Sequence, residues 1–119
     1  MENIQQLNAA SLRIGNLLQV GNKIEKLELV DFADMYENST LIHYQPIPLT
    51  EEWLLKLGFT KSLIFNSYYI NSDIEINIFD NIFWYDTKND SIEIQSVHEL
   101  QNLFYALTKR ELTYERPTN

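Results

Sequence analysis

The chain has 119 residues, of which 45% are hydrophobic and 22% charged, with only three Gly and three Pro. This length and composition fit one folded domain and exclude a globally disordered chain. The absence of Cys excludes disulfides, zinc–thiolate sites and thiol catalysis. We expect a single domain over residues 1–119, with loose ends at residues 1–10 and 116–119.

The acidity of the chain allows two interpretations, because 17 acidic residues stand against 9 basic ones and give a net charge of −8. This charge favours solubility, and it also suits a surface that docks on a basic groove of a protein partner. It disfavours direct binding to nucleic acid. No apolar run approaches the roughly 20 residues that cross a membrane, and the first ten residues lack the apolar core of a secretory signal. We therefore expect a cytoplasmic protein that does not bind membranes.

Apolar residues near the start of the chain predict two strands. Residues 12–19 (LRIGNLLQ) and 23–32 (KIEKLELVDF) flank Gly21-Asn22, a turn signal that is typical of a hairpin. The same spacing leaves a rival open, in which residues 23–37 form one amphipathic helix. Residues 41–44 (LIHY) are expected to form a third short strand.

The segment 46–59 (PIPLTEEWLLKLGF) carries the signals of a short helix. Its two early prolines favour extended backbone, and Thr50 is a good N-cap that is followed by two acidic residues in the first turn. Gly58 can adopt the left-handed conformation that ends a helix. We expect a helix over about residues 50–58.

From residue 62 the apolar period changes to two, which predicts strands. Turn-prone clusters separate four apolar runs, and short connections make antiparallel neighbours. The runs are Leu63–Ile70, Ile74–Phe79, Ile82–Tyr85 and Ile92–Gln95. We therefore expect a four-stranded meander, with residues 112–115 (LTYE) as a candidate edge strand.

A second helix is expected over about residues 97–108. Ser96 and Glu99 form an S-x-x-E capping box, and an apolar stripe follows at helical spacing. Its members are Val97, Leu100, Leu103, Phe104 and Leu107. A stripe of this kind covers a sheet, so we predict an α+β fold: an antiparallel meander with an N-terminal strand pair and both helices packed on the sheet.

No catalytic, metal-binding or cofactor-binding motif is recognisable in the sequence. His43 and His98 have no partner residue at the spacing of a catalytic motif, and His98 is interpreted as a surface or capping residue. The H-E-x-x-H and EF-hand patterns are missing, and the three glycines are scattered. We therefore predict a non-enzymatic protein with no cofactor and no metal.

Two acidic patterns are candidate binding sites for a protein partner with a basic, nucleic-acid-binding surface. The first recurs every third residue and consists of Glu25, Glu28, Asp31, Asp34 and Glu37. These residues line up only if the segment is helical, because such a spacing alternates faces on a strand. The candidates of the second pattern, within residues 71–100, are Asp73, Glu75, Asp86, Asp90 and Glu93. The default interpretation of both patterns is a solvated surface.

Aromatic residues gather in the same part of the chain as the second acidic pattern. Phe83, Trp84 and Tyr85 are consecutive, and consecutive residues of a strand point to opposite faces. Either Trp84 or the Phe83–Tyr85 pair therefore points outward, where it could anchor a protein partner among the acidic residues. The alternative is that a second layer, formed by the N-terminal strands, covers that face.

Three blocks, LRIGN, PIPLTEEWLLKLGF and VHELQNLFYALTKREL, occur in this order over about residues 11–113. They resemble a family of small proteins carried by phages and prophages. In similar sequences the region after LRIGN is a glycine-turned strand pair, which favours strands over the helical rival. Lys109-Arg110 stands where the family commonly has Gly-Glu, so the last helix is expected to end less sharply. The family has no assigned activity; it implies a mobile-element setting and no functional residues.

In that setting a small, acidic, cysteine-free protein is similar in type to anti-CRISPR inhibitors. Some of these occupy the guide-binding surface of RNA-guided RNases of the type VI class. The likeness is one of size, charge and context, and it implies a non-enzymatic inhibitor of a bacterial defence effector in the cytoplasm of the bacterial host. The alternative is a structural or assembly component of a phage particle.

Overall fold

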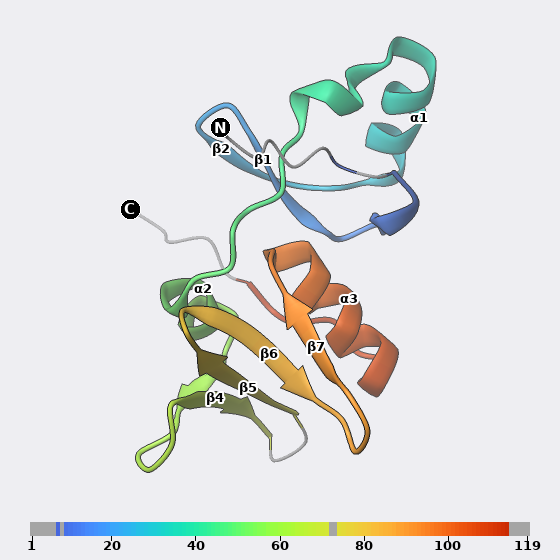
Figure 1. The fold of residues 1–119 in the computed structure, drawn as a ribbon. Coiled ribbons are helices and arrows are strands. Elements are labelled where there is room, and N and C mark those ends of the chain that lie inside the picture. The colour runs from blue at the N-terminus through green and yellow to red at the C-terminus, as the bar shows by residue number, and fades with distance from the viewer. Residues whose placement is uncertain (1–6, 8, 72–73, 115–119) are drawn as a thin grey trace. The chain divides into compact units, whose positions relative to one another are not determined.

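The computed structural model describes residues 7, 9–71 and 74–114 (Figure 1). Within them lie three α-helices and two antiparallel sheets, one of two strands and one of five, so the predicted α+β class is confirmed. The elements in chain order are η1 (Ala9–Ser11), β1 (Leu17–Val20), β2 (Lys23–Lys26), α1 (Leu29–Asn38), η2 (Thr40–His43), α2 (Glu51–Lys56), β3 (Thr60–Lys61), β4 (Ser67–Ile70), β5 (Ile74–Phe79), β6 (Ile82–Asp86), β7 (Ser91–Ile94) and α3 (Val97–Thr108).

The chain divides into two compact units. The first unit holds Met1–Pro48 and Ser96–Asn102, and the second holds Leu49–Gln95 and Leu103–Asn119. Helix α3 contributes its first half to one unit and its second half to the other. The expectation of one domain stays a prediction. Of the ends expected to be loose, residues 9 and 10 belong to η1, whereas residues 1–6, 8 and 116–119 lie outside the described part of the chain.

In the first unit, β1 and β2 form the expected antiparallel hairpin. The first strand begins only at Leu17, so the strand predicted over residues 12–19 is wrong for residues 12–16. The second strand is shorter than predicted: it ends at Lys26, and α1 begins at Leu29. The Asp31 carboxylate accepts the backbone N–H of Glu28 at 2.7 Å, which satisfies a donor at the start of this helix. Each of the two interpretations of residues 23–37 is therefore right for part of the segment.

The strand predicted over residues 41–44 is wrong, because this segment lies in and just after the 3₁₀ helix η2. Ser39 adopts a left-handed φ of 56° after α1 and turns the chain. Extended pairing begins only at Gln45, which exchanges backbone hydrogen bonds of 2.8 and 2.9 Å with Gln19 of β1. Leu41 is apolar because it packs against the core of this unit, and the 3₁₀ turn achieves that packing without a strand.

In the second unit, α2 confirms the signals predicted at both ends of the helix. The Thr50 hydroxyl accepts the backbone N–H of Trp53 at 3.1 Å, which satisfies a donor of the first turn. Gly58 has a φ of +97°, and the N–H of Phe59 bonds the carbonyl of Leu54 at 2.9 Å. This bond is typical of the Schellman motif, in which a left-handed glycine ends the helix.

The five-stranded sheet has the order β3-β4-β5-β6-β7, and each neighbouring pair is antiparallel. The expected meander is present and gains β3 at one edge. The strand predicted over Leu63–Ile70 is wrong in its first half, because β4 begins only at Ser67. The candidate edge strand is wrong for residues 112–114, which form no strand, and residue 115 lies outside the described part.

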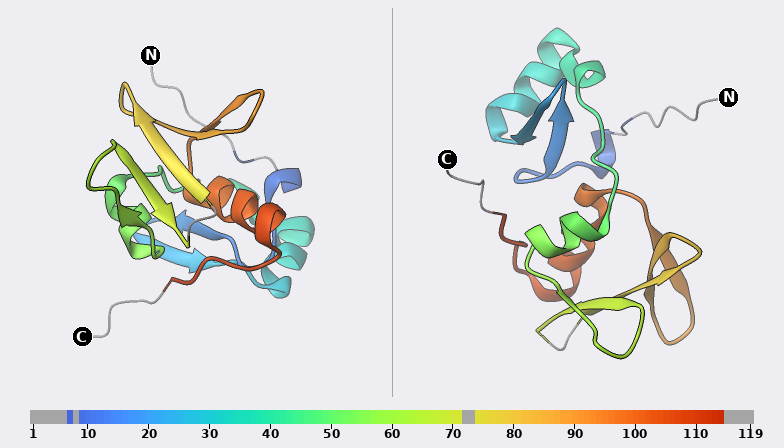
Figure 2. Two further views of the ribbon diagram at one scale, coloured as in Figure 1. Left: turned by 90° about the horizontal axis from the view of Figure 1, so that it is seen from below. Right: turned by 90° about the vertical axis from the view of Figure 1, so that its left-hand side faces the viewer.

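One face of this sheet forms part of the core of the second unit. Tyr68, Ile74, Ile76 and Ile94 are each no more than 3% exposed, and the pairing register places them on the same side. Helix α2 covers this side (Figure 2), where the Tyr68 hydroxyl donates to the Glu51 carboxylate at 2.8 Å. The opposite face of the sheet is therefore the one that carries the polar residues.

Helix α3 buries most of its predicted apolar stripe. The Ser96 hydroxyl accepts the N–H of Glu99 at 3.4 Å, which is the N-cap half of the expected capping box, and donates to the Glu99 carboxylate at 3.1 Å. Leu100 is fully buried and Phe104 is 5% exposed, whereas Leu107 is 47% exposed. The last member of the stripe therefore faces solvent.

Candidate functional site

The polar face of the five-stranded sheet carries most of the second acidic pattern. Trp84 lies on β6 between Asn77 of β5 and Glu93 of β7. Because alternate residues of a strand share a face, the register assigns one set of side chains to this side. We call it the open face, and it consists of Thr60, Ser67, Tyr69, Glu75, Asn77, Phe79, Ile82, Trp84, Asp86, Ser91 and Glu93. Ser67 is the one fully buried member of this set.

Hydrogen bonds hold carboxylates of the open face in place. Asp86 accepts hydrogen bonds from Asn77 Nδ2 at 2.8 Å and from Ser91 Oγ at 2.6 Å. Glu75 accepts one from Ser67 Oγ at 2.6 Å. Both acidic residues are exposed. Since their side chains are already ordered, contact with a partner costs less side-chain entropy.

Trp84 is the central aromatic residue of the open face. Phe83 lies on the other side of the sheet, opposite the buried Ile94, so Trp84 is the outward member of the aromatic run. Its side chain is partly exposed beside Glu93. A tryptophan with carboxylate neighbours, in a set of side chains that contains no Lys or Arg, suits a partner surface that is basic and partly apolar.

Two candidates of the second acidic pattern are not on the open face. Asp90 is exposed in the turn between β6 and β7, where its carbonyl accepts the N–H of Thr87 at 2.7 Å. Asp73 lies outside the described residues. The fold brings the remaining candidates of this pattern together with Trp84 on one surface.

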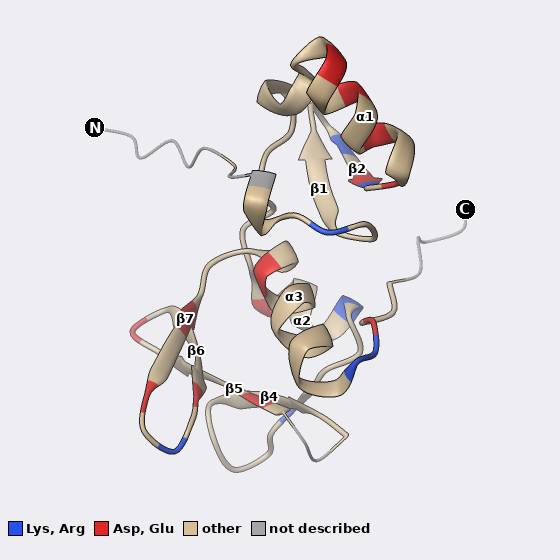
Figure 3. Cartoon of the chain, turned by 90° about the vertical axis from the view of Figure 1, so that its right-hand side faces the viewer, with Lys and Arg blue, Asp and Glu red and all other residues tan. Residues whose placement is uncertain are grey.

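The first acidic pattern lies in the other unit and does not form one row. Glu25 is on β2 and Glu28 precedes α1, whereas Asp31, Asp34 and Glu37 lie within α1 (Figure 3). Only the last three residues have the helical geometry that would align them. The segment therefore offers a shorter acidic surface than the sequence pattern indicates.

Part of this first pattern is used to stabilise the local fold. Asp34 accepts hydrogen bonds from Asn38 Nδ2 at 2.7 Å and from Thr40 Oγ1 at 2.9 Å, and these bonds lower the pKa of Asp34. Burial and the nearby negative charges of Asp31 and Asp34 raise the pKa of Tyr44. The open face is the better candidate for an external partner, because the register gathers three carboxylates and a tryptophan on one surface, whereas the first pattern does not form one row.

His98 is buried beside the cap residue of α3, with 4% of its surface exposed, and does not lie at the surface. Its Nδ1 lies 3.1 Å from Ser96 Oγ, and its Nε2 lies 3.5 Å from Ser11 Oγ. Burial lowers the pKa of His98 against the opposing effect of Glu99, which favours the neutral ring. A neutral imidazole held between two hydroxyls and shielded from solvent has a packing role, and we assign it no catalytic role.

A buried polar network joins the LRIGN segment to α3. Gln101 Oε1 accepts the N–H of Leu17 at 2.8 Å, and Gln101 Nε2 donates to the Gly15 carbonyl at 3.1 Å. Asn16 is fully buried, and its Nδ2 donates to Asn102 Oδ1 at 2.9 Å. Two of the blocks that carry the family resemblance therefore meet here and stabilise the first unit. Sequence reasoning missed this network, although the adjacent amides Gln101 and Asn102 inside an apolar helix were a signal for it.

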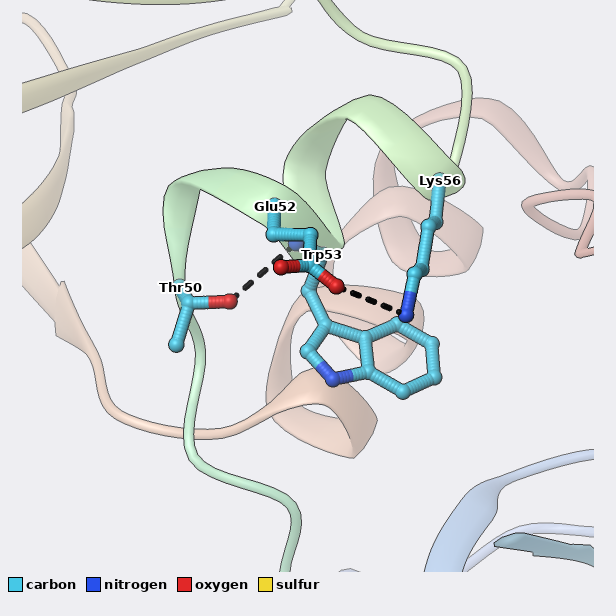
Figure 4. A network of polar contacts seen from close by, with 4 residues as sticks. All are labelled: Thr50, Glu52, Trp53 and Lys56. Atoms are coloured by element: carbon cyan, nitrogen blue, oxygen red, sulfur yellow. Dashed lines mark hydrogen bonds and ion pairs between the residues drawn. The ribbon is translucent and has the colours of Figure 1, made fainter.

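The second unit also contains an open hollow of about 570 Å³ at the end of α2. Apolar residues such as Leu57 and Phe104 line it together with Lys56. The Lys56 ammonium already pairs with Glu52 at 3.0 Å and lies 5.0 Å from the centre of the Trp53 ring (Figure 4). The charged residues that line the hollow are Lys56, Arg110 and Glu111.

Among residues 7, 9–71 and 74–114, no group of three or more His, Asp or Glu side chains could hold a metal ion. In the same part of the chain, none of the helices has the length and apolar character needed to span a membrane. No family model, no curated protein and no solved structure matches the sequence. The resemblance to phage-borne proteins therefore stays an expectation from the three sequence blocks.

Proposed function

We propose that this protein is a non-enzymatic binding protein that docks on a basic surface of another protein through the open face. The observation that carries the proposal is the strand register, which gathers Glu75, Asp86 and Glu93 around Trp84. Carboxylates attract and orient a basic partner during the encounter. Tryptophan supplies an anchor of the kind that dominates binding energy in protein interfaces.

The charge of the chain favours a protein partner over direct binding to nucleic acid. A net charge of −8 repels phosphate groups. Lys and Arg side chains that bind a phosphate backbone also pair with carboxylates. Carboxylates that are fixed on a sheet, as Glu75 and Asp86 are, can therefore occupy a basic channel that would otherwise hold RNA or DNA.

The setting implied by the family resemblance narrows the class of partner. A phage or prophage benefits from blocking a bacterial defence effector, and RNA-guided RNases of the type VI class hold their guide on a basic surface. We therefore propose an inhibitor of the anti-CRISPR type that acts in the cytoplasm of the bacterial host and competes for such a guide-binding surface.

The proposal is tested with purified protein and a purified RNA-guided RNase of the type VI class, prepared with and without guide RNA. We expect the protein to bind the RNase, to reduce RNA cleavage and to bind less tightly when guide RNA is already present. We also expect the affinity to fall as salt rises from about 50 to 300 mM, because salt screens the attraction between the charges.

Unchanged RNA cleavage at saturating protein would contradict the proposed inhibition. Binding that does not respond to salt would contradict the role of the carboxylates. Co-purification of the protein with phage particles, together with defective particles when its gene is deleted, would instead support the alternative of a virion component.

A further inference from the structure

The segment between β3 and β4 exposes three consecutive apolar side chains. Relative to a fully exposed residue, the exposed fractions are 102% for Leu63, 83% for Ile64 and 66% for Phe65. We call residues 62–66 the apolar loop. Contiguous exposed apolar surface on a soluble protein commonly marks an interaction site, because its hydration is unfavourable.

Hydrogen bonds hold the apolar loop in one shape. Ser62 Oγ accepts the N–H of Ile64 at 3.2 Å and the N–H of Phe65 at 3.1 Å. The N–H of Ser62 bonds the carbonyl of Ser67 at 2.9 Å, which closes the base of the loop. The apolar side chains are therefore presented on an ordered backbone, and binding through them costs less conformational entropy than binding through a disordered segment.

The apolar loop adjoins the open face of the sheet. Asn66 Nδ2 donates to the Ile78 carbonyl at 3.1 Å, and the N–H of Ile78 donates to the Asn66 carbonyl at 3.0 Å. The next residue of β5 is Phe79, an open-face residue that is 76% exposed. The combined surface has an apolar end, formed by the loop and Phe79, and an acidic end, formed by Glu75 and Asp86. On β5, Glu75 is four residues from Phe79, and on β6, Asp86 is four residues from Ile82, the partner of Phe79.

We propose that the apolar loop is an anchor that inserts into an apolar pocket bordered by Lys and Arg on the partner protein. This inference rests on the proposed function, and it adds a second recognition element to the carboxylates. Charge complementarity favours such a partner over other occupants. A second copy of the chain carries the same net charge of −8 and would repel the acidic end of this surface. An anionic membrane surface would repel the chain for the same reason.

The test compares two double variants of the full chain. Leu63→Ser with Phe65→Ser removes the anchor. Val30→Ser with Ile42→Ser is the matched control, because these residues of α1 and η2 are 70% and 79% exposed and lie in the other unit. All four side chains are exposed, so we expect both variants to keep the thermal midpoint of the wild type. The probe is the type VI RNase, and its affinity is measured at two salt concentrations.

We expect the anchor variant to bind the RNase about 30-fold more weakly or worse, with the salt dependence of the wild type, and the control variant to bind normally. Equal affinity of the wild type and the anchor variant would overturn this inference and leave the proposed function in place. Failure of the wild type to bind would overturn both. Self-association of the wild type that is lost in the anchor variant, measured by sedimentation, would identify a second copy as the occupant and would also overturn the inference.

Discussion

Lys109 follows α3 at a position where glycine would be the least strained residue. Its φ is +61°, and its N–H closes the last turn on the Tyr105 carbonyl at 2.7 Å. A left-handed conformation costs an ordinary side chain about 1–2 kcal/mol. The helix ends at Thr108, and Lys109 carries backbone strain at the position where the resembling family commonly has glycine. The expectation of a less sharp end stays a prediction.

Replacing this residue tests the strain directly. Lys109→Gly should raise the free energy of unfolding by about 0.5–1 kcal/mol, because the relief of strain exceeds the extra entropy of glycine in the unfolded chain. Lys109→Ala keeps the Cβ atom and should match the wild type. Urea denaturation of the three proteins measures the difference. A Gly variant that is less stable than the Ala variant would show that the left-handed position is not strained.

The burial of His98 predicts a pH dependence of stability. Because the pKa of His98 is lower in the folded protein than in the unfolded chain, the unfolded chain binds a proton first as the pH falls below about 6.5. The free energy of unfolding should therefore decrease from neutral pH downward, until the pH passes below the folded pKa. In His98→Gln this contribution is absent, so the decrease between about pH 7 and 5 should be shallower.

Chemical denaturation of the wild type and His98→Gln at several pH values in this range measures the two slopes. The comparison depends on the slopes and not on the absolute stabilities, so any packing defect of the glutamine side chain cancels. Parallel slopes would contradict a depressed pKa and indicate that His98 is protonated as easily in the folded protein as in the unfolded chain.

At the scale of the secondary structure elements, the second half of α3 depends on one aromatic side chain. Phe104 is 5% exposed, so Phe104→Ala should lower the free energy of unfolding by about 3–5 kcal/mol through lost burial and the cavity that remains. Leu107→Ala on the same helix is the control, because its side chain is 47% exposed and its loss should cost much less. A near-neutral Phe104→Ala would show that the stripe is not part of the core.

The helices that begin and end on local signals could be predicted from the sequence. Thr50 and Gly58 bracket α2, and Ser96 starts α3, through contacts that span only a few residues. The boundary between β2 and α1 could not be predicted, because the same apolar spacing fits a strand and a helix. The strand predicted over residues 41–44 failed for a related reason: Leu41 reaches the core from a 3₁₀ turn, and only the folded unit shows this.

The candidate site was predictable in part. Alternation along a strand limits the outward aromatic residues to Trp84 or its neighbours, but it does not say which face is buried. The register across β5, β6 and β7 decides this, and register is a property of several strands together. The apolar character of residues 63–65 predicts a strand, whereas in the structure the hydroxyl of Ser62 bonds the backbone of Ile64 and Phe65 and the chain bends there.

At the scale of the whole molecule, net charge and charge position have different consequences. A chain with a net charge of −8 attracts any basic protein. At a salt concentration of 0.1 M, this attraction is largely screened between charges that are more than about 10 Å apart. Salt dependence alone therefore does not identify the binding surface. The position of the carboxylates can identify it. Carboxylates on the open face and carboxylates elsewhere contribute equally to the net charge, so two variants of equal net charge differ only in where the charges lie.

The most direct measurement is the affinity of two variants of equal net charge for the type VI RNase. Glu75→Lys with Glu93→Lys reverses two exposed carboxylates of the open face, and Glu37→Lys with Glu52→Lys reverses two exposed carboxylates on α1 and α2. If the open face is the binding surface, the first variant binds about tenfold more weakly or worse, and the second binds nearly as well as the wild type. An equal loss of affinity in both variants would contradict this and would mean that net charge, and not the open face, governs binding.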